Sequence, residues 1–262
     1  MTSITGTSLP DTLLGESGID IIFGLEGSDL IRGSTGNDSI YGNQGNDEVF
    51  GGSDDDVIYG GKGDDFLDGD SIPTTSIDFL LDLDTPSGND LILGNLGADI
   101  IFGGELSDTL FGGQGNDSII GGTGGDLVSG DLGDDLLVGV DLDLLSLSPN
   151  PFSSITFSSF EKDTLIGGAG ADEFFLGDTS NIYYNESGDD DYALIVDFNL
   201  SEGDLIIVTS SGDYFLDNIS LPGLGSGAGI FLNPSFGSRE LIGFVQGIDA
   251  SSLTGFGKFV QV

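Results

Sequence analysis

The sequence predicts an all-β protein, because three properties of the chain favour short strands joined by tight turns. Gly contributes 46 of the 262 residues, about 18%, against an average near 7%. Asp outnumbers Glu 36 to 9, and Asp suits turns whereas Glu is a good helix former. The third property is a nine-residue period in which a Gly-containing turn alternates with a run rich in β-branched and aromatic residues.

The charge is extreme and limits the possible partners. Forty-five acidic and five basic residues give a formal net charge of −40, which repels nucleic acid and anionic lipid. Cys and His are absent, which excludes disulfides, zinc fingers, thiol nucleophiles and imidazole-bound metals. Leu, Ile, Val and Phe make up about 32% of the chain, well above the ~20% typical of disordered chains. A chain apolar enough to fold but this acidic suggests a divalent cation.

The period is clearest in the pattern Gly-x-x-Gly-Asn-Asp, which occurs at Gly33–Asp38, Gly42–Asp47 and Gly112–Asp117. Extending the register predicts fifteen units between Gly6 and Phe175. They begin at Gly6, Gly15, Gly24, Gly33, Gly42, Gly51, Gly60, Gly69, Gly94, Gly103, Gly112, Gly121, Gly130, Gly139 and Gly167. Two units carry insertions between positions 3 and 4, and these are Ser71–Ser87 and Asp141–Phe160.

Each column of the repeat has a physical interpretation. Position 1 is always Gly and position 4 is Gly in eleven units. We expect both to adopt φ > 0, so that the loop closes tightly and its carbonyls turn toward a common point. Positions 7 to 9 predict a three-residue strand, and position 8, apolar from Leu13 to Phe174, predicts its inward face.

Position 6 is Asp in all fifteen units. Carboxylate and carbonyl oxygens without nitrogen or sulfur suit a hard cation, and flexible oxygen cages favour Ca²⁺ over Mg²⁺. The predicted metal ligands are therefore Asp11, Asp20, Asp29, Asp38, Asp47, Asp56, Asp65, Asp90, Asp99, Asp108, Asp117, Asp126, Asp135, Asp163 and Asp172. The alternative is a Gly/Asp-rich solenoid whose aspartates only form turns, but turns alone would accept Asn or Ser in this column.

These residues resemble the RTX (repeats-in-toxin) calcium-binding nonapeptide, Gly-Gly-x-Gly-x-Asp-x-U-x, where U is apolar. The second glycine is matched at Gly52, Gly61, Gly104, Gly113, Gly122 and Gly168. Over residues 6–175 the resemblance implies a parallel β-roll, a calcium β-solenoid in which two repeats form one turn. Residues 18 apart then stack, and Ca²⁺ lies between successive loops on the same side.

The resemblance divides the aspartates into two rows. Row A is Asp20, Asp38, Asp56, Asp90, Asp108, Asp126 and Asp163, and row B contains the other eight. The gaps between loops allow at most about 13 calcium ions, which would change the net charge from −40 to about −14. Burial of a single inward row of apolar side chains stabilises the roll by less than the conformational entropy that ordering so long a chain costs. We therefore expect folding to require calcium.

The insertions and the strands that follow row A raise two open questions. Both insertions interrupt row-A loops, and they could form a cover on one edge of the roll or a partner-binding lobe. Positions 7 and 9 after row A carry no charge and include Phe23, Tyr41, Tyr59 and Phe111. This uncharged face could be covered by other segments, or it could mediate self-association or docking of a partner.

Residues 176–262 lack the repeat and predict six strands as a C-terminal β cap: Tyr192–Phe198, Asp204–Val208, Tyr214–Leu216, Gly229–Leu232, Glu240–Gln246 and Lys258–Val262. Leu194–Phe198 and Gly203–Ile207 resemble the segment that closes the roll in serralysin-like and cyanobacterial RTX proteins. The resemblance implies type I secretion and a secreted or extracellular location. The lack of an N-terminal signal peptide and of any 18-residue apolar run agrees with it. Asp189–Asp191 could hold another calcium or form a solvated loop.

No enzymatic activity is expected. Serralysin proteases use a zinc-binding His pair, and this chain has no His, no Gly-x-Ser-x-Gly elbow and no phosphate loop. We expect a secreted calcium-binding protein of the bacterial surface or matrix that acts as a structural or self-assembling subunit. The alternative is a polysaccharide- or partner-binding module with Tyr41 and Tyr59 as aromatic platforms. Ice binding is disfavoured because position 3 is Thr only at Thr35 and Thr123 among the intact loops.

Overall fold

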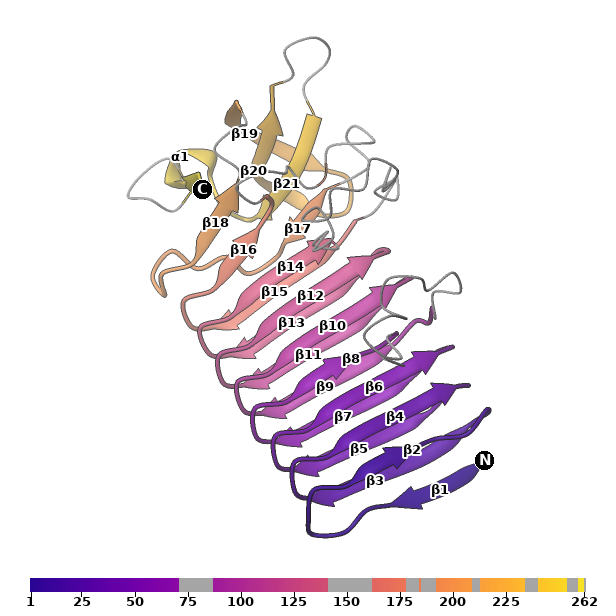
Figure 1. Ribbon diagram of the computed structural model, residues 1–262. Helices are drawn as coiled ribbons and strands as arrows, with labels where there is room; N and C mark the ends of the chain where they lie inside the picture. The colour runs from indigo at the N-terminus through magenta and orange to yellow at the C-terminus, as the bar shows by residue number, and fades with distance from the viewer. Residues whose placement is uncertain are drawn as a thin grey trace, which may run out of the picture.

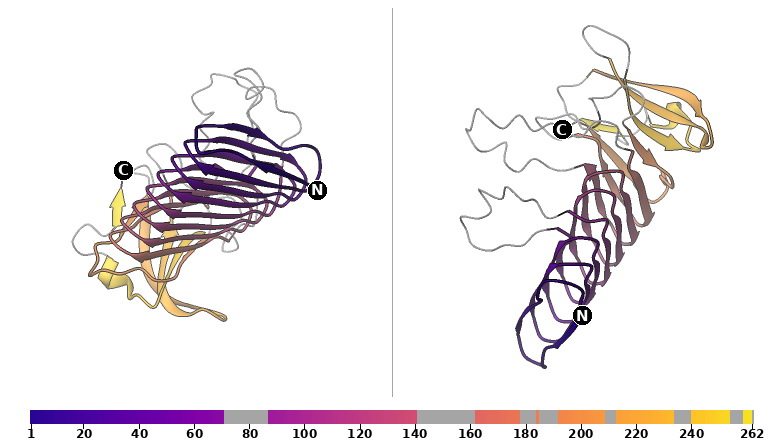
Figure 2. Two further views of the ribbon diagram at one scale, coloured as in Figure 1. Left: turned by 90° about the horizontal axis from the view of Figure 1, so that it is seen from below. Right: turned by 90° about the vertical axis from the view of Figure 1, so that its right-hand side faces the viewer.

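The computed structural model describes residues 1–70, 87–140, 162–177, 184, 192–208, 213–233, 240–253 and 259–261. The chain winds into a flattened coil with one sheet on each side, and the N-terminal and C-terminal strands lie at opposite ends (Figures 1 and 2). The predicted all-β parallel β-roll is confirmed. Whether the insertions form a cover or a partner-binding lobe stays open, because residues 71–86 and 141–160 lie outside those described.

Sheet A contains the strands that follow the row-A loops, together with the N-terminal strand and four strands from beyond the repeats. In spatial order these are β1 (Thr2–Thr5), β3 (Asp20–Glu26), β5 (Ser39–Gln44), β7 (Val57–Lys62), β9 (Leu91–Leu96), β11 (Thr109–Gln114), β13 (Leu127–Leu132), β15 (Thr164–Ala169), β17 (Ala193–Ile195), β21 (Glu240–Gln246), β20 (Gly225–Leu232) and β19 (Tyr214–Leu221).

Sheet B contains the strands that follow the row-B loops, together with two strands from beyond the repeats. In spatial order these are β2 (Thr12–Leu14), β4 (Leu30–Thr35), β6 (Glu48–Ser53), β8 (Phe66–Asp68), β10 (Ile100–Glu105), β12 (Ser118–Thr123), β14 (Leu136–Val140), β16 (Glu173–Phe175), β18 (Leu205–Val208) and β22 (Phe259–Gln261).

The register agrees with two repeats per turn. Thr109 of β11 pairs with Leu127 of β13, 18 residues later, in parallel. Val57 of β7 pairs with Leu91 of β9, so the stacking resumes in register across the first insertion. A typical strand is twice as long as predicted and runs from position 7 through position 3 of the next unit, as in β5 and β11. Positions 1 to 3 join the strands because they stack on the same positions of the neighbouring turns.

The prediction for the loop glycines was wrong at position 1. The residues with positive φ occupy positions 2 and 4, such as Gly113 at +114° and Gly115 at +133°. The first insertion also lies one residue earlier than predicted. Ser87 occupies position 3, because its carbonyl accepts the position-4 N–H of Asp54 on the preceding turn, as position-3 carbonyls do elsewhere. The inserted residues are therefore 71–86.

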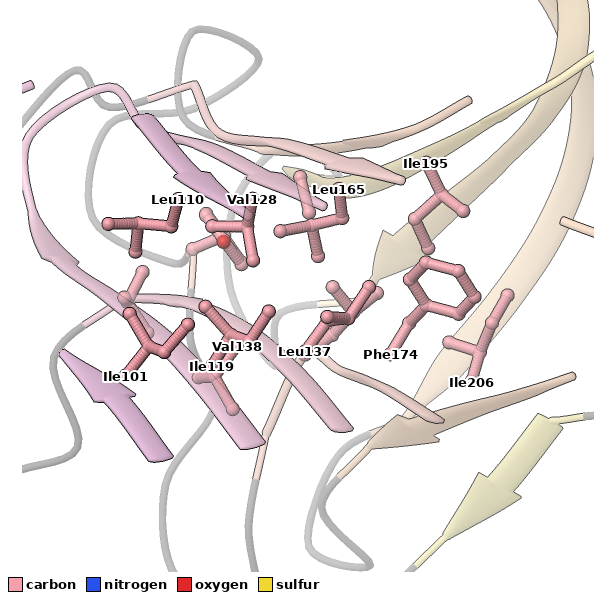
Figure 3. Packing of buried hydrophobic residues seen from close by; sticks show 14 of the residues in the cluster. Ile101, Leu110, Ile119, Val128, Leu137, Val138, Leu165, Phe174, Ile195 and Ile206 are labelled. Carbon is pink, nitrogen blue, oxygen red and sulfur yellow. The ribbon is translucent and has the colours of Figure 1, made fainter. Parts of the chain in front are cut away.

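The core is the predicted row of position-8 side chains. From Ile22 to Phe174 all fourteen are fully buried, and only Leu13, on the terminal strand β2, is partly exposed. In Figure 3, Leu110, Val128, Leu165 and Ile195 of sheet A face Ile101, Ile119, Leu137, Phe174 and Ile206 of sheet B. The space between the sheets is one side chain deep on each side, so little apolar area stabilises each turn.

Both sheets continue past the end of the repeats. β17 pairs with β15 and β18 pairs with β16, and β21 and β22 then extend the two sheets in parallel. β19 and β20 form an antiparallel hairpin, in which β19 ends later than the predicted Leu216 and β20 begins earlier than the predicted Gly229. A four-residue helix, α1 (Ala250–Leu253), was not predicted. Within the described residues, no helix has the length and apolar character needed to cross a membrane.

Candidate calcium-binding site

The position-6 aspartates form the two predicted rows, one along each edge of the roll. Each aspartate lies at the end of a loop that leads into sheet A or sheet B. Fourteen of the fifteen predicted ligands are buried, with at most 3% of their surface exposed. Asp11, in the first loop, is partly exposed. The pairing of residues 18 apart places the aspartates of each row directly above one another.

In every row aspartate after Asp11, one carboxylate oxygen links the residue to the previous turn. Oδ1 accepts a hydrogen bond from the backbone N–H of the row neighbour before it, at 2.6–3.2 Å. In row A this series of hydrogen bonds begins at the N–H of Thr2 and ends at the carboxylate of Asp163. In row B it begins at the N–H of Asp11 and ends at the carboxylate of Asp204. These hydrogen bonds replace a backbone–backbone ladder at position 6 and explain why the side chain must be short.

The second oxygen distinguishes a metal site from a turn. Among the described residues, eleven row aspartates bury Oδ2 without a hydrogen-bond partner. They are Asp29, Asp38, Asp47, Asp56, Asp65, Asp90, Asp99, Asp108, Asp117, Asp135 and Asp172. An unpaired buried carboxylate oxygen is strongly unfavourable unless it coordinates a cation. An anionic oxygen repeated on every turn fits a hard divalent ion such as calcium.

The position-1 glycines leave space beside these oxygens. A Cβ on Gly24 would lie 2.5 Å from Asp29 Oδ2 and 2.7 Å from the carbonyl oxygen of Gly42 on the next turn. Gly60 repeats the arrangement, at 2.5 Å from Asp65 Oδ2 and 3.0 Å from the Gly94 carbonyl oxygen. Position 1 is therefore Gly because a side chain would fill the space between a carboxylate and a carbonyl, rather than because of its φ.

Electrostatics points the same way. Burial raises the pKa of Asp56 to about 8 and of Asp108 to about 9, and neighbouring carboxylates add repulsion. The pKa values of Asp65, Asp90 and Asp172 rise to about 7 for the same reasons. Those of five further row aspartates rise to about 6, namely Asp38, Asp47, Asp99, Asp117 and Asp135. A divalent cation would remove this penalty by stabilising the ionised forms.

Three predicted ligands differ from the rest. Oδ2 of Asp11 accepts the N–H of Thr7, and Oδ2 of Asp20 accepts the N–H of Glu16. Burial opposes ionisation of Asp20, but the hydrogen bonds from Glu16 and Thr2 outweigh it and lower its pKa. Oδ2 of Asp163 accepts the buried hydroxyl of Tyr184, at 2.6 Å. At these row ends, donors from the protein occupy the oxygen that is unpaired in the eleven aspartates named above.

Sequence reasoning missed three carboxylates near the loops. Asp204 continues row B by accepting the N–H of Asp172, and its Oδ2 accepts the N–H of Asn199. The two oxygens of Asp197 bind the N–H groups of Gly167 and Gly168 in the last row-B loop. The apolar residues after Asp204 follow the spacing of positions 7 to 9 and could have revealed it. The third, Asp70, lies at position 2 of the first split loop.

Position 5 forms a separate polar ladder on the outer side of the loops. Asp55 Oδ1 accepts the N–H of Asn89, and Asp64 Oδ1 accepts the N–H of Ala98, each on the next turn. These aspartates are exposed, so solvent can satisfy their other oxygens. They provide matched controls for substitutions of the row aspartates, because they carry the same charge and belong to the same loops.

Carboxylates alone do not complete a metal site in the part of the chain that the structure describes. No three acidic side chains gather closely enough there to hold an ion by themselves. Carbonyl oxygens line up on the same loop edges: a Cβ on Gly27, for example, would lie 2.9 Å from the Leu9 carbonyl oxygen of the preceding turn. The donor set is therefore one carboxylate per turn with loop carbonyls, all oxygen, as calcium prefers. Asp189–Asp191 lie outside the described residues.

Stacked oxygen-lined loops on a parallel β-roll define a calcium-binding β-solenoid. Comparison with protein families agrees: the RTX calcium-binding nonapeptide repeat (4 copies) matches residues 5–40, 41–71, 87–110, 102–137 and 160–192. These ranges cover more than half of the chain, and the protein belongs to this family. No curated protein matches the chain. The repeats establish calcium as the ligand of the roll.

Proposed function

We propose that this is a secreted, non-enzymatic calcium-binding protein whose roll folds when it binds calcium outside the cell. The observation that carries the proposal is the set of eleven buried aspartate oxygens without a hydrogen-bond partner in the described loops. Without a cation each one destabilises the folded state. When calcium is bound, the same oxygens coordinate it between successive turns. The free energy of calcium binding then contributes to the free energy of folding.

The two oxygens of a row aspartate have different functions in this proposal. Oδ1 of each row aspartate after Asp11 accepts a backbone N–H of the preceding turn, and Oδ2 lies beside the position-1 glycine. Bound calcium supplies the positive charge that lets carboxylates stack one turn apart. At most about 13 ions fit the two rows. The donors already present on Asp11, Asp20 and Asp163 favour a smaller number.

Chelation tests this proposal directly. Far-UV circular dichroism should show a largely unfolded chain in EGTA and a cooperative gain of β structure when calcium is added. A site held at 100 times its dissociation constant adds about 2.7 kcal/mol, so several sites together account for a sharp transition. Magnesium at the same concentration is the control and should restore little structure. A spectrum that EGTA leaves unchanged would contradict the proposal.

We propose type I secretion as the route of export. Its support is the resemblance of Leu194–Phe198 and Gly203–Ile207 to the closing segment of secreted RTX proteins. At submicromolar cytosolic calcium the chain would stay unfolded and exportable, and it would fold outside. Deleting residues 203–262 should abolish export through a type I system. Unchanged export of the deleted protein would refute this route.

At the surface, we propose a structural or self-assembling role that uses the uncharged face of sheet A. Phe23, Tyr41 and Tyr59 stack there at 4.9 Å between ring centroids and are half-buried. A continuous aromatic ladder suits contact with another apolar surface. Static light scattering should show calcium-dependent assembly that the double variant Tyr41→Asp, Phe111→Asp abolishes. Assembly that survives this change would exclude the face as the interface.

The same ladder supports a second candidate, a polysaccharide- or partner-binding module. Aromatic rings spaced along a flat sheet can stack against sugar rings. A glycan array probed in calcium separates the two roles. Glycan binding by a monomeric protein would favour the module, and assembly without glycan binding would favour the structural subunit.

A further inference from the structure

The first split loop carries a buried carboxylate at position 2, whereas the other acidic residue at this position of a row-A loop, Glu16, is exposed. In a regular loop the position-2 carbonyl accepts the position-3 N–H of the next turn, as Thr7 accepts from Glu26. Position 2 also lies directly over position 2 of the next turn, as Gly104 lies over Gly122. In the unit that begins at Gly69, position 2 is Asp70.

At Asp70 the backbone leaves this ladder. β8 ends at Asp68, and its pairing with β10 stops at the pair Phe102–Asp68. The chain returns at Ser87, which occupies position 3. The insertion therefore removes the position-2 backbone from the place that it occupies in regular loops.

The side chain of Asp70 replaces the displaced backbone. Its Oδ2 accepts the N–H of Glu105, the position-3 donor of the next turn. The carboxylate lies against Gly104, where a Cβ would strike the Asp70 side chain. In the regular loop that follows, a Cβ on Gly122 would instead strike the backbone carbonyl of Gly104. A carboxylate oxygen thus substitutes for a carbonyl oxygen in this part of the ladder.

The other oxygen of Asp70 is left buried and unpaired. Asp70 is only 6% exposed, and its Oδ1 has no hydrogen-bond partner among the described residues. Asp90, the row-A aspartate of the same unit, also buries an unpaired Oδ2. A Cβ on Gly69, the residue before Asp70, would meet both Asp90 Oδ2 and the carbonyl oxygen of Gly103. The first split loop therefore holds two unpaired carboxylate oxygens, and one of them, Asp90 Oδ2, shares the space beside Gly69 with a carbonyl oxygen.

We propose that Asp70 is an additional calcium ligand that, together with Asp90, completes the row-A site in the split loop. This rests on the proposed calcium-dependent function and extends it to a position that the nonapeptide does not assign to a carboxylate. An extra anionic oxygen strengthens calcium binding and offsets the loss of a regular loop carbonyl. The insertion at residues 71–86 therefore does not cost the roll a calcium site.

The second split loop provides a comparison. Its position 2 is Val140, which stays in register over Gly122 and brings no carboxylate. Its aspartate, Asp163, instead accepts the hydroxyl of Tyr184. The two interrupted loops thus differ in chemistry: one gains an anionic oxygen, and the other gains a neutral donor.

The test is to count bound calcium ions in the full-length chain. Asp70→Asn keeps an oxygen for the Glu105 N–H but removes the charge, and Asp70→Gly restores the glycine found at this position in neighbouring loops. Asp55→Asn is the matched control, because it removes one charge from an exposed position on an adjacent turn. Native mass spectrometry counts ions on folded molecules, and calcium titration calorimetry measures their affinities.

Both Asp70 variants should bind one ion fewer than the wild type, or bind one ion at least about tenfold more weakly, whereas Asp55→Asn should match the wild type. Asp70 variants with the wild-type number and affinities would overturn the proposal. A wild-type chain that binds no calcium would instead overturn the proposed function itself, so the two failures can be told apart.

Discussion

At the residue scale, the two oxygens of one aspartate have separate tasks. Oδ1 replaces a backbone acceptor in the ladder between turns, and Oδ2 is reserved for the loop interior. Asn could perform the first task, since its carbonyl oxygen accepts the same hydrogen bond. Only Asp supplies a second, anionic oxygen. This explains why position 6 is never Asn or Ser and argues against a purely turn-forming role.

Asp117→Asn tests this division. Asp117 is buried, and its Oδ1 accepts the N–H of Asp99. The variant keeps that hydrogen bond, so it should fold in saturating calcium but bind one or two fewer ions. Its unfolding free energy should fall by about 2.7 kcal/mol for each site lost at 100 times its dissociation constant. Calcium titration followed by urea unfolding measures both.

Asp64→Asn is the control for this experiment, because Asp64 is exposed and its hydrogen bond to Ala98 survives the change. It should leave ion number and stability within about 0.5 kcal/mol of the wild type. Equal losses in the two variants would show that the effect comes from general charge rather than from a site.

Tyr184→Phe tests the closing donor on row A. The hydroxyl of Tyr184 donates to the carboxylate of Asp163 from a buried position. Its removal should destabilise the calcium-saturated protein by about 1.5–3 kcal/mol, the range for hydrogen bonds to charged groups. Thermal unfolding measures the loss. Tyr59→Phe, on the half-buried face of sheet A, should have little effect, and equal effects of the two changes would contradict the assignment.

At the element scale, the loop glycines are required for two different reasons. Positions 2 and 4 have positive φ, which favours Gly but tolerates Asn43, Asn95 and even Leu25. Position 1 has no positive φ in the described units and is Gly because of space. This explains why position 1 is uniform although positions 2 and 4 vary.

Gly60→Ala tests the space requirement. The new Cβ would lie 2.5 Å from Asp65 Oδ2, so the carboxylate must move and the calcium midpoint of folding should rise severalfold. Gly125→Ala is the control, since the nearest atom to its Cβ would be 3.5 Å away and its φ is ordinary. Circular dichroism during calcium titration measures the midpoints. A normal midpoint for Gly60→Ala would show that the space is not used.

At the scale of the whole molecule, the fold buries a substantial part of the acidic charge, since sixteen aspartates among the described residues are buried. Burial raises the pKa of Asp56 to about 8 and of Asp108 to about 9, while an unfolded aspartate titrates near 3.8. Between these values the metal-free folded state binds more protons than the unfolded state. The unfolding free energy of the metal-free roll therefore decreases as the pH rises.

The expected outcome is an inverted pH dependence. This stabilisation is complete below pH 3.8 and is lost as the pH rises through about 6 to 9. Calcium-free protein should therefore show more β structure at about pH 5.5 than at pH 8. Calcium-loaded protein should behave oppositely and lose affinity in acid, because protons compete for the same oxygens. Circular dichroism in metal-depleted buffer, with and without added calcium, measures both. Calcium-free protein with less structure at pH 5.5 would contradict the expectation.

Much of the architecture could be predicted from the sequence, because a nine-residue repeat forces each unit into the same local geometry. The resemblance to the RTX nonapeptide implied the stacking of Thr109 on Leu127, and the apolar column predicted the core from Ile22 to Phe174. Strand length and the role of position 1 could not be predicted. Both depend on contacts with the turns above and below, 18 residues away in the chain.

The sequence by itself determined the roll, its two aspartate rows and the oxygen-only chemistry that selects calcium. Fifteen identical aspartates could not, however, be told apart without their surroundings. Only the tertiary structure decided that Asp163 receives a hydroxyl from Tyr184, that Asp204 extends row B, and that Asp70 replaces a missing carbonyl. The physical reason is that a repeat specifies local geometry, whereas the partner of each oxygen depends on which distant segment lies over it.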